Sequence, residues 1–565
     1  MHDSFIIKIN KDLTSCDNNF LEKLKECEEK KIESYIPKSY IKEYHPLVVV
    51  ISGSRQFLDD FLETYGGVLQ LEALFISEHE KNTLFIKRQK DKFNISVERP
   101  LILDPEKCTL CRKCVGLCEK GAIRPDPSVD ISLCNQCGKC AEVCNFGAID
   151  LFRRELIELA ADEVVIDEAL LANFDKSVPE GIFRSSALKG LFKKIGSFEI
   201  EELVKYQFEL CSYDTRLKVG CKRCIDTCKN DAILQEDDGI RLNHELCIGC
   251  GSCISACPTG ALEYTLLDDK GFVEYFRTLD LNSGIHIVIG EEDELKELWW
   301  NLGDFSSDNF FFFIHQLPFS LSSFHFLFLS TIGIGKVFIL SEKDKPTAFL
   351  DEVNFTNSIL KNILKRDFVE IVTRGEFLKD INGLKSKVLQ VLNLDSSGLK
   401  FENRRQGLSY LLYLLYSNLI KDEIFISTDK FCQITLDNKC CLCLSCLNVC
   451  FQEALIASEE ELALYIKQDK CINCKACLDI CPEKAISLIP GLRLCHELFN
   501  KRLLIKDEPV KCTKCGKTFA NKKSFTHTIS ILKEKGCLDK KTLKILSRCE
   551  TCRAKAFFEE ILNGK

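Results

Sequence analysis

The sequence predicts an α+β protein in which three small cysteine-rich modules are joined by α/β domains, with a further four-cysteine domain at the C-terminus. Three observations lead to this fold class. The chain has 565 residues, too many for a single hydrophobic core. It contains 34 cysteines, most of them in repeated groups. Between the groups, strand-like and helix-like segments alternate, which is typical of a parallel sheet with crossover helices.

The expected domains follow the cysteine groups along the chain. We expect cysteine-rich modules 1, 2 and 3 at residues 101–155, 207–268 and 431–490. The remaining segments are an N-terminal α/β domain (1–100), a partly helical linker (156–206), an α/β domain (280–400), a helical connector (401–430) and a four-cysteine domain (505–565).

The role of the cysteines depends on the compartment. A secreted disulfide protein needs an export signal, but residues 1–13 contain neither a basic segment nor an apolar one of useful length. We therefore expect a cytoplasmic protein whose clustered cysteines bind metal. The net charge of −8 gives no basic character overall, so we expect no nucleic-acid partner.

The most apolar part of the chain is residues 310–340, which include His315, Pro318 and His325. No uninterrupted apolar run of about 18 residues occurs, so we expect no transmembrane segment. Contact with a membrane would come only through a partner protein. We expect residues 310–340 to form two buried strands with a helix between them.

One cysteine motif, C-x2-C-x2-C-x3-C, occurs in full five times. The copies are Cys108, Cys111, Cys114 and Cys118; Cys134, Cys137, Cys140 and Cys144; Cys247, Cys250, Cys253 and Cys257; Cys440, Cys443, Cys446 and Cys450; and Cys471, Cys474, Cys477 and Cys481. In a sixth copy, Cys221, Cys224 and Cys228 keep the spacing, but Lys218 replaces the first cysteine and Cys211 lies upstream. An alanine and an aliphatic residue follow each copy, which predicts a short strand over the site.

This spacing suits a cubane 4Fe-4S cluster, which needs four thiolates. C-x2-C-x2-C wraps a loop around three irons, and the fourth thiolate comes from the other motif of a pair, as in two-cluster ferredoxins. In the altered copy, an inserted loop could bring Cys211 to the cluster. The alternatives are a three-cysteine 3Fe-4S site or a lost cluster.

The motif pairs resemble the bacterial dicluster ferredoxin family, three times over. The resemblance implies three ferredoxin-like dicluster modules joined by α/β (Rossmann-like) domains, with about six 4Fe-4S clusters in all. The implied ligand sets are Cys108, Cys111, Cys114 and Cys144; Cys134, Cys137, Cys140 and Cys118; Cys211, Cys221, Cys224 and Cys257; Cys247, Cys250, Cys253 and Cys228; Cys440, Cys443, Cys446 and Cys481; and Cys471, Cys474, Cys477 and Cys450. Cys441 lies beside Cys440, but the motif spacing favours Cys440 as the ligand.

Four further cysteines form two C-x2-C pairs near the C-terminus, Cys512 with Cys515 and Cys549 with Cys552. Two separated pairs of this kind look like a zinc-ribbon site, so we expect one structural Zn²⁺. A further iron–sulfur site and free thiols are the alternatives. His527 and Cys537 lie between the pairs and could compete as ligands.

The segments between the modules show strand and helix patterns. Residues 47–52 and 68–76 are strand-like, with a helical pattern at 55–65 between them. The second α/β domain has strand-like runs at 285–289, 310–314, 336–340 and 368–372, with helical stretches at 291–302 and 354–365. The loop at 331–337 lacks the third glycine of a dinucleotide fingerprint, so we expect a docking scaffold without a nucleotide. Residues 408–420 predict an apolar helix.

The order of these parts resembles a family of bacterial multi-cluster 4Fe-4S proteins associated with molybdenum or tungsten formate dehydrogenases. The resemblance implies an electron-transfer protein that relays electrons between a dehydrogenase, with formate dehydrogenase as the candidate, and a redox acceptor. The alternatives are a maturation or assembly factor for such a metalloenzyme, and an enzyme with its own substrate at a special cluster. We name no catalytic residues, because the sequence has no radical C-x3-C-x2-C motif and no flavin fingerprint.

Overall fold

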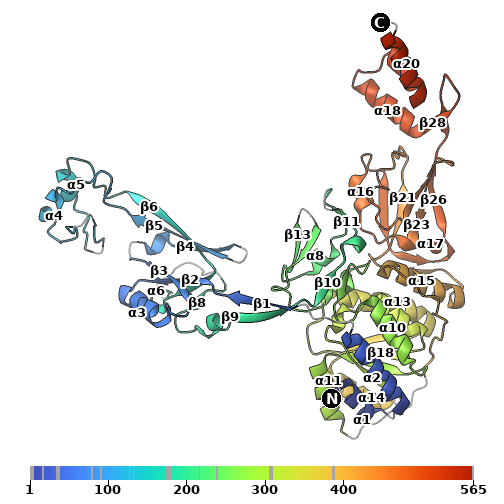
Figure 1. Cartoon of the computed structure of the whole chain (residues 1–565), viewed down its shortest axis with the longest axis horizontal. Helices are drawn as coiled ribbons and strands as arrows, with labels where there is room; N and C mark the ends of the chain where they lie inside the picture. Colours follow the sequence, from blue (N-terminus) through green and yellow to red (C-terminus); the bar gives the residue numbers. More distant parts are fainter. Residues whose placement is uncertain are drawn as a thin grey trace. The chain divides into compact units, whose positions relative to one another are not determined.

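The computed structural model describes residues 5–14, 18–33, 39–77, 80–89, 92–125, 128–131, 133–171, 180–214, 217–236, 239–303, 309–384 and 389–562 (Figure 1). The chain divides into two compact units. Unit 1 comprises Met1–Lys38 and Glu201–Lys565, and unit 2 comprises Ser39–Ile200. Each unit has its own hydrophobic cores and is described by itself.

Unit 2 contains a parallel sheet with the strand order β3 (Gln70–Phe75), β2 (Leu47–Ser52), β7 (Glu163–Ile166) and β8 (Phe183–Arg184). Strand β2 is an almost unbroken apolar run and is buried, as central parallel strands usually are. Helix α3 (Arg55–Tyr65) follows it and begins where Ser54 accepts a hydrogen bond from the backbone N–H of Phe57. The strand–helix–strand pattern expected at 47–76 is confirmed.

Module 1 is inserted into a second, antiparallel sheet of unit 2, with the order β4 (Phe85–Gln89), β5 (Lys92–Pro100) and β6 (Arg154–Ala161). Pro100 and Arg154 are paired at the ends of β5 and β6. The residues between them therefore leave the sheet and return to it at one place. They include two short helices, α4 (Lys113–Leu117) and α5 (Lys139–Val143).

The segment expected at 156–206 as a partly helical linker contains two short helices, α6 (Glu168–Leu171) and α7 (Lys189–Phe192). It also contributes strands β6, β7, β8, β9 (Gly196–Glu201) and β10 (Val204–Tyr206), so it is not only a linker. The physical reason is the buried EVVI run of β7, which pairs beside β2 and completes the core of unit 2. Strand β9 pairs with β1 (Ser39–Tyr44).

Unit 1 contains an all-parallel sheet with the order β17 (Phe310–Ile314), β16 (His286–Gly290), β18 (Lys336–Leu340) and β19 (Val369–Val372). Its helices are α10 (Asp269–Leu279), α11 (Glu292–Leu302), α12 (Ser323–Thr331), α13 (Thr347–Leu364) and α14 (Arg374–Leu384). The parallel sheet expected at 280–400 is confirmed. So is the expectation for residues 310–340, because α12 is buried along its whole length between β17 and β18 in the chain. Within the described residues, no helix has the length and apolar composition that crossing a membrane requires.

The N-terminal domain expected at 1–100 is also corrected, because helices α1 (Phe5–Leu13) and α2 (Asn18–Glu33) belong to unit 1. Asn10 of α1 donates to the carbonyl of Phe312 (2.8 Å), and the Phe312 N–H donates back to Asn10 (2.9 Å). Ile9 and Leu13 share an apolar cluster with Phe310 and Phe312. The apolar face of α1 is therefore covered by strand β17, far away in sequence.

Modules 2 and 3 flank the second α/β domain in sequence and lie in unit 1. Module 2 holds η2 (Phe208–Leu210), β11 (Tyr213–Asp214), β12 (Val219–Gly220), α8 (Arg223–Thr227), β13 (Ile233–Glu236), β14 (Gly239–Leu242), α9 (Ser252–Ala256) and β15 (Leu262–Tyr264). Module 3 holds β21 (Cys432–Leu436), β22 (Leu455–Ser458), β23 (Ala463–Lys467), α16 (Ala476–Ile480) and β24 (Ile486–Pro490). The expected connector contains helix α15 (Arg404–Leu419) and strand β20 (Ile424–Ile426), which pairs with β25 (Leu492–Leu494).

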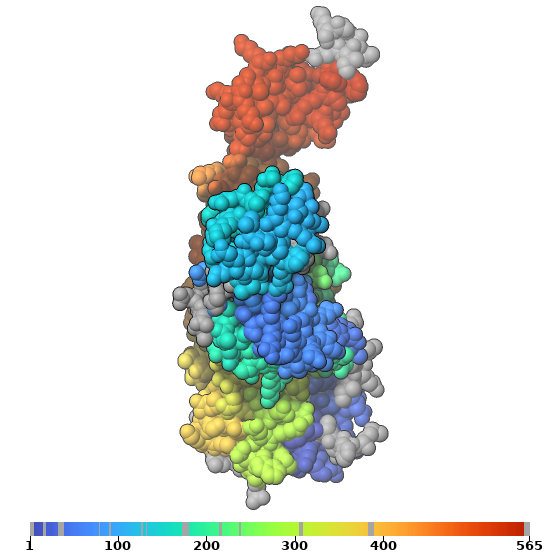
Figure 2. Space-filling view, turned by 90° about the vertical axis from the view of Figure 1, so that its left-hand side faces the viewer, coloured from blue at the N-terminus to red at the C-terminus, as the bar shows by residue number. Residues whose placement is uncertain are grey.

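The C-terminal residues form a lobe of their own in unit 1, coloured red in Figure 2. After α17 (His496–Phe499) and β26 (Lys501–Lys506), the lobe contains β27 (Pro509–Lys511), β28 (Thr518–Asn521), α18 (Lys522–Glu534), α19 (Lys540–Leu546) and α20 (Glu550–Leu562). Its buried core is very small: Cys512, Cys549 and Cys552, with Phe519 packed against them. So small an apolar core suggests that the lobe depends on a metal for stability.

Candidate metal centres

The loops between the cysteines share one backbone conformation. In all five full motif copies, the residues on both sides of the second cysteine have positive φ. These residues are Leu110 and Arg112, Gln136 and Gly138, Gly249 and Gly251, Leu442 and Leu444, and Asn473 and Lys475. Non-glycine residues rarely adopt this conformation, so its repetition indicates loops that are shaped for binding rather than for packing.

The sixth motif copy is completed by a hairpin. Strands β11 and β12 pair, and the Cys221 N–H donates to the carbonyl of Ser212 (3.0 Å), so Cys211 is returned to the side of Cys221. Gly220 has a φ of 111°, and a Cβ there would lie 2.3 Å from the Ser212 carbonyl oxygen, so only glycine fits this turn. The inserted loop expected from the sequence is present.

The residues after the fourth cysteine of each copy also share a conformation. The third residue after it has positive φ in all six copies: Gly121, Gly147, Asp231, Gly260, Glu453 and Lys484. The turn brings the next N–H onto the cysteine sulfur: Ala122 donates to Cys118 Sγ (3.3 Å), Ala148 to Cys144 (3.3 Å) and Ala485 to Cys481 (3.4 Å). Such N–H donors stabilise a thiolate and tune the potential of a cluster that it holds.

The structure brings four cysteines of module 2 around one cavity, namely Cys211, Cys221, Cys224 and Cys257, here called the Cys211 set. Burial raises the pKa of Cys221 to about 11, and the neighbouring charges of Cys257 and Cys211 contribute. The second group, the Cys247 set, consists of Cys228, Cys247, Cys250 and Cys253. Burial raises the pKa of Cys253, and the charges of Cys247, Cys250 and Cys228 raise it further, which indicates that the four cysteines are neighbours.

Module 3 repeats this arrangement. A second cavity is lined by Cys450, Cys471, Cys474 and Cys477, here called the Cys471 set. The Cys440 set consists of Cys440, Cys443, Cys446 and Cys481. Burial, followed by the charges of Cys440, Cys443 and Cys481, raises the pKa of Cys446 to about 12. In both modules, three members come from one motif and the fourth from the other.

In module 1, the structure brings the cysteines of each motif together. The pKa of Cys114 is raised by burial and by Cys108 and Cys111, and that of Cys140 by burial and by Cys134 and Cys137. Cys118 and Cys144, the expected crossed ligands, pack against the same small apolar core. The exchange of fourth cysteines in module 1 stays a prediction.

The residues present fit iron–sulfur clusters. The Cys211 cavity is lined by the four cysteines of its set and the Cys471 cavity by the four of its set and Cys432, and among the described residues no carboxylate lines either cavity. An all-sulfur set of four selects zinc or an iron–sulfur centre. The distinction comes from the motif, because C-x2-C-x2-C with a remote fourth cysteine is the ferredoxin arrangement.

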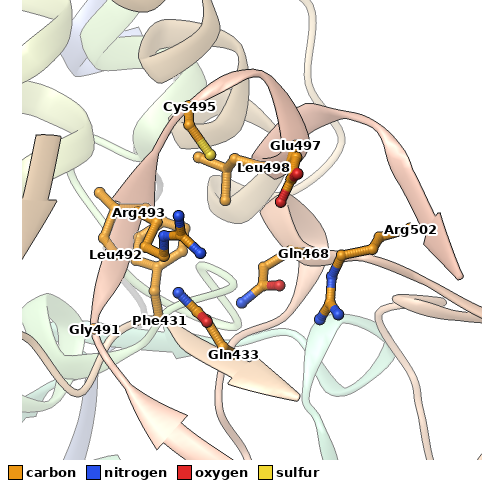
Figure 3. Close-up of a pocket in the computed structure, with 10 residues that line it drawn as sticks. All are labelled: Phe431, Gln433, Gln468, Gly491, Leu492, Arg493, Cys495, Glu497, Leu498 and Arg502. Atoms are coloured by element: carbon orange, nitrogen blue, oxygen red, sulfur yellow. The ribbon is translucent and has the colours of Figure 1, made fainter. Parts of the chain in front are cut away.

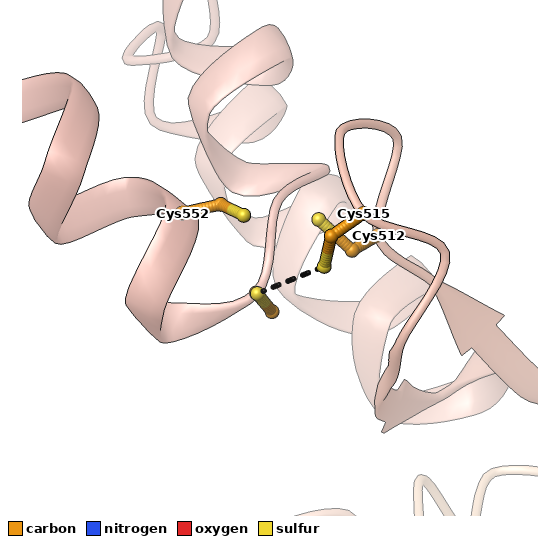
Figure 4. Close-up of side chains that lie close together, drawn as sticks. Cys512, Cys515 and Cys552 are labelled. Atoms are coloured by element: carbon orange, nitrogen blue, oxygen red, sulfur yellow. Dashed lines mark hydrogen bonds between the residues drawn. The ribbon is translucent and has the colours of Figure 1, made fainter.

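The four C-terminal cysteines form a separate group. The ligand atoms of Cys512, Cys515, Cys549 and Cys552 all lie within 4.8 Å of one another. Figure 4 shows Cys512 and Cys515 facing α20, with a dashed line for the 3.6 Å contact between Cys515 and Cys549. Desolvation would raise the pKa of Cys512, but hydrogen bonds from the backbone of Cys549, Cys515 and Lys514 lower it to about 6. A thiol that ionises so easily is ready to bind a metal.

The two residues expected to compete for this site lie elsewhere. His527 of α18 forms an ion pair with Glu483 of module 3 (Nε2 to Oε1, 2.9 Å), and Cys441 is close to both. Cys537 is exposed and donates to the carbonyl of Lys535 (3.5 Å). The four-cysteine group therefore assembles without them.

Sequence reasoning missed one cysteine beside a site. Cys432 lines the cavity of the Cys471 set, and its Sγ lies 3.7 Å from Cys471 Sγ. Cys432 begins strand β21 and belongs to no cysteine motif, so the sequence does not indicate that it lies beside Cys471. A further cavity, between module 3 and residues 491–502, is lined by one cysteine, Cys495 (Figure 3). Its arginines are already engaged, since Arg493 pairs with Glu423 and Arg502 donates to the carbonyl of Ile434 (2.8 Å).

The comparison with family models agrees with this geometry. Residues 101–124, 240–263 and 464–487 match one model of a 4Fe-4S binding domain, and residues 127–149 match a second model with the same description. The chain carries several ferredoxin-type 4Fe-4S domains. These domains include both motifs of module 1 and the second motif of modules 2 and 3. A search of curated proteins found no match.

Proposed function

We propose that the protein is an iron–sulfur electron carrier that relays electrons through about six 4Fe-4S clusters, one for each cysteine set. The observation that carries the proposal is the closeness of the two sets within a module. Cys253 and Cys257 lie one turn apart at helix α9 and belong to different sets of module 2, and Cys477 and Cys481 lie likewise at α16 in module 3. Redox centres placed this near to one another serve electron hopping better than a reaction on a bound substrate.

The chain's residues have three roles in this function. Thiolates hold each cluster, which when bound supplies one-electron oxidation and reduction. Apolar side chains such as Ile240 and Leu262 line the Cys211 cavity and exclude water. Backbone N–H groups such as those of Ala122 and Ala148 donate to cysteine sulfurs and stabilise their negative charge.

The partners belong to the proposal as well. By its resemblance, the protein would accept electrons from a dehydrogenase, with formate dehydrogenase as the first candidate, and pass them to a redox acceptor. A reducing cytoplasm suits its free cysteines. One Zn²⁺ at the C-terminal four-cysteine group would fold the lobe rather than carry electrons.

The deciding experiment measures iron, acid-labile sulfide and zinc per chain on protein purified without oxygen. We expect about 24 iron, about 24 sulfide and zinc at the C-terminal group. About 20 iron would mean one lost cluster, and Cys211→Ser would then leave the content unchanged. Very little iron and sulfide would overturn the proposal.

The zinc assignment is tested by Cys549→Ser, with Cys537→Ser as the matched control. Cys549 belongs to the four-cysteine group, whereas Cys537 is an exposed cysteine of the same lobe outside the group. We expect Cys549→Ser to release zinc with iron unchanged, and Cys537→Ser to change neither. Loss of iron with Cys549→Ser would instead assign this group to a further iron–sulfur centre.

A further inference from the structure

Two cysteine sets from different modules lie against a common wall. The cavity of the Cys211 set in module 2 and that of the Cys471 set in module 3 are both lined by Ser212 and Ile472. Each of these residues directly follows a cysteine of its set. The ligand loops of the two sets therefore form a wall that both cavities share.

Side chains fix the two modules across this wall. Gln452 of module 3 donates to the hydroxyl of Ser212 in module 2 (2.9 Å). Arg223 of α8 and Asn473 of the module 3 loop both donate to the carbonyl of Asp429, each at 2.7 Å. These hydrogen bonds connect the two modules directly and through Asp429. The fold therefore fixes the distance between the two cysteine sets.

Two consecutive arginines at the start of α15 hold one module each. Arg404 donates to the carbonyl of Cys257 in the Cys211 set (3.0 Å). Arg405 donates to the carbonyls of Asp469 (2.7 Å) and Cys471 in module 3. Both side chains are buried, at 3% and 2% exposure. The first turn of α15 therefore contacts both cysteine sets, one through each arginine.

The charges of the two arginines are balanced differently. Arg404 forms a two-pronged ion pair with Asp269, with nitrogen–oxygen distances of 2.8 and 2.7 Å. Arg405 stacks over the ring of Phe431, 3.6 Å from its centroid. A buried cation is costly unless negative groups lie nearby. The charges that stabilise Arg405 are those of Cys471, a member of the Cys471 set, and of the Asp469 carboxylate.

We propose that the Cys211 and Cys471 sets form an inter-module junction that joins modules 2 and 3 into one array of four centres, with Arg405 as the positioning residue that favours the reduced state at the Cys471 set. This inference rests on the proposed electron-carrier function. The order in the array is the Cys247, Cys211, Cys471 and Cys440 sets. An electron that crosses the wall leaves one set oxidised and the other reduced, and no bond is made or broken.

The ends of the array differ from its middle. Each outer set includes one exposed cysteine, Cys250 in the Cys247 set and Cys443 in the Cys440 set. No member of the two inner sets is exposed. The outer sets are thus the places at which redox partners would exchange electrons, and the inner sets are insulated from them.

The junction is tested by electron paramagnetic resonance of the fully reduced protein. Cys250→Ala with Cys443→Ala removes the outer centres, whereas Cys224→Ala with Cys474→Ala removes the inner ones. Module 1 contributes equally to both spectra. We expect spin–spin broadening from unit 1 in the first double variant and its loss in the second. Equal broadening, or none, in both variants would overturn the junction.

Iron analysis separates this result from the function itself. Each double variant is expected to retain about 16 iron, four clusters of four. A chain that holds no clusters before mutation would refute the electron-carrier proposal, whereas a chain with clusters but without coupling would refute the junction alone.

Arg405 gives a second test that leaves every cysteine in place. We expect Arg405→Gln to shift the reduction potential of one cluster to a lower value with iron content unchanged, and Arg405→Lys to restore most of the shift. Arg493→Gln, which removes a partly exposed arginine of β25, just after module 3, that is paired with Glu423, is the control and should shift no potential. If Arg405→Gln lowers stability but leaves every potential unchanged, Arg405 has only a structural role.

Discussion

Module 1 and modules 2 and 3 use the same cysteine motif in different surroundings. Module 1 protrudes from the ends of β5 and β6, and none of its eight motif cysteines is buried, whereas Cys224 and Cys257 of module 2 are. Hydrogen bonds lower the pKa of Cys111, and the one from the backbone of Lys113 has the largest effect. In modules 2 and 3, burial raises the pKa of Cys221 to about 11 and that of Cys474 to about 12.

One motif can therefore occur in two electrostatic environments. In module 1, N–H groups lower the pKa of exposed Cys111, although burial raises the pKa of Cys114 and Cys140. In modules 2 and 3, burial raises the pKa of Cys221 and Cys474, which lie further from water, and the buried Arg405 supplies positive charge beside the Cys471 set. The reduction potential of a cluster depends on its net charge, hydrogen bonds and exposure, so the modules should differ in potential.

The largest expected effect comes from removing one ligand on each side of this comparison, with Cys224→Ala in module 2 and Cys111→Ala in module 1. Each variant should lose about four iron. Only Cys224→Ala should also weaken unit 1, because Cys224 belongs to its large apolar core whereas Cys111 is exposed in unit 2. The chain's two tryptophans, Trp299 and Trp300, lie in unit 1, so their fluorescence during urea unfolding reports this unit.

If both variants lower the urea midpoint of tryptophan fluorescence equally, modules 1 and 2 are energetically linked, and the proposed difference between them is wrong. If neither variant lowers this midpoint, the Cys211 cavity does not stabilise the apolar core of unit 1.

A second pair of variants examines the choice between two adjacent cysteines, Cys440→Ser and Cys441→Ser. The charge of Cys440 is felt by Cys446, and Cys441 is buried beside the set. We expect Cys440→Ser to lose about four iron and Cys441→Ser to retain them. The reverse result would shift the motif by one residue, and iron analysis of the two purified proteins decides it.

The buried ion pair of Arg404 and Asp269 should matter far more for stability than an exposed one of similar geometry. Arg404→Ala leaves Asp269 buried without its partner, which we expect to cost about 3–5 kcal/mol in the free energy of unfolding. Arg493→Ala breaks a pair with Glu423 that is more than two-fifths exposed on both sides, and should cost about 0–1 kcal/mol. Urea unfolding of both variants gives the two values, and equal costs would contradict the assignment of Arg404 to the core.

The smallest expected effect is a pH dependence of the α/β domain of unit 1. Burial, followed by the charges of Arg366 and Lys336, lowers the pKa of His286 to about 4. The unfolded chain therefore takes up a proton as the pH falls through about 6.5, while the folded chain does so only near pH 4. Stability should fall by up to about 2 kcal/mol between pH 7 and pH 5.

His286→Gln should remove this part of the pH dependence, measured by tryptophan fluorescence at pH 7 and pH 5. His496, which is exposed on α17, provides the control substitution His496→Gln. If the stability of His286→Gln falls between pH 7 and pH 5 as much as that of the unchanged protein, other groups cause the sensitivity to acid.

Several elements could be predicted from the sequence because their signals are local. Strands β2, β17 and β18 are short apolar runs between polar segments, and α3 begins after a serine cap. The grouping of helices α1 and α2 with unit 1 could not be predicted, because an apolar helix face does not show which strand will cover it. Strand β7 could not be predicted either, since it forms by pairing beside β2.

Which cysteines form groups could be read from the sequence, because metal-binding motifs are encoded by spacing within a few residues. How the groups meet depends on long-range packing: a hairpin returns Cys211 to its set, Cys432 lies beside Cys471, and His527 pairs with Glu483. Arg404 and Arg405 are two adjacent arginines in the sequence, and nothing local distinguishes them from a solvated pair. Their role comes from burial against two modules: Cys257 lies about 150 residues from Arg404 along the chain, and Cys471 about 65 residues from Arg405. A local sequence pattern cannot show contacts over such separations.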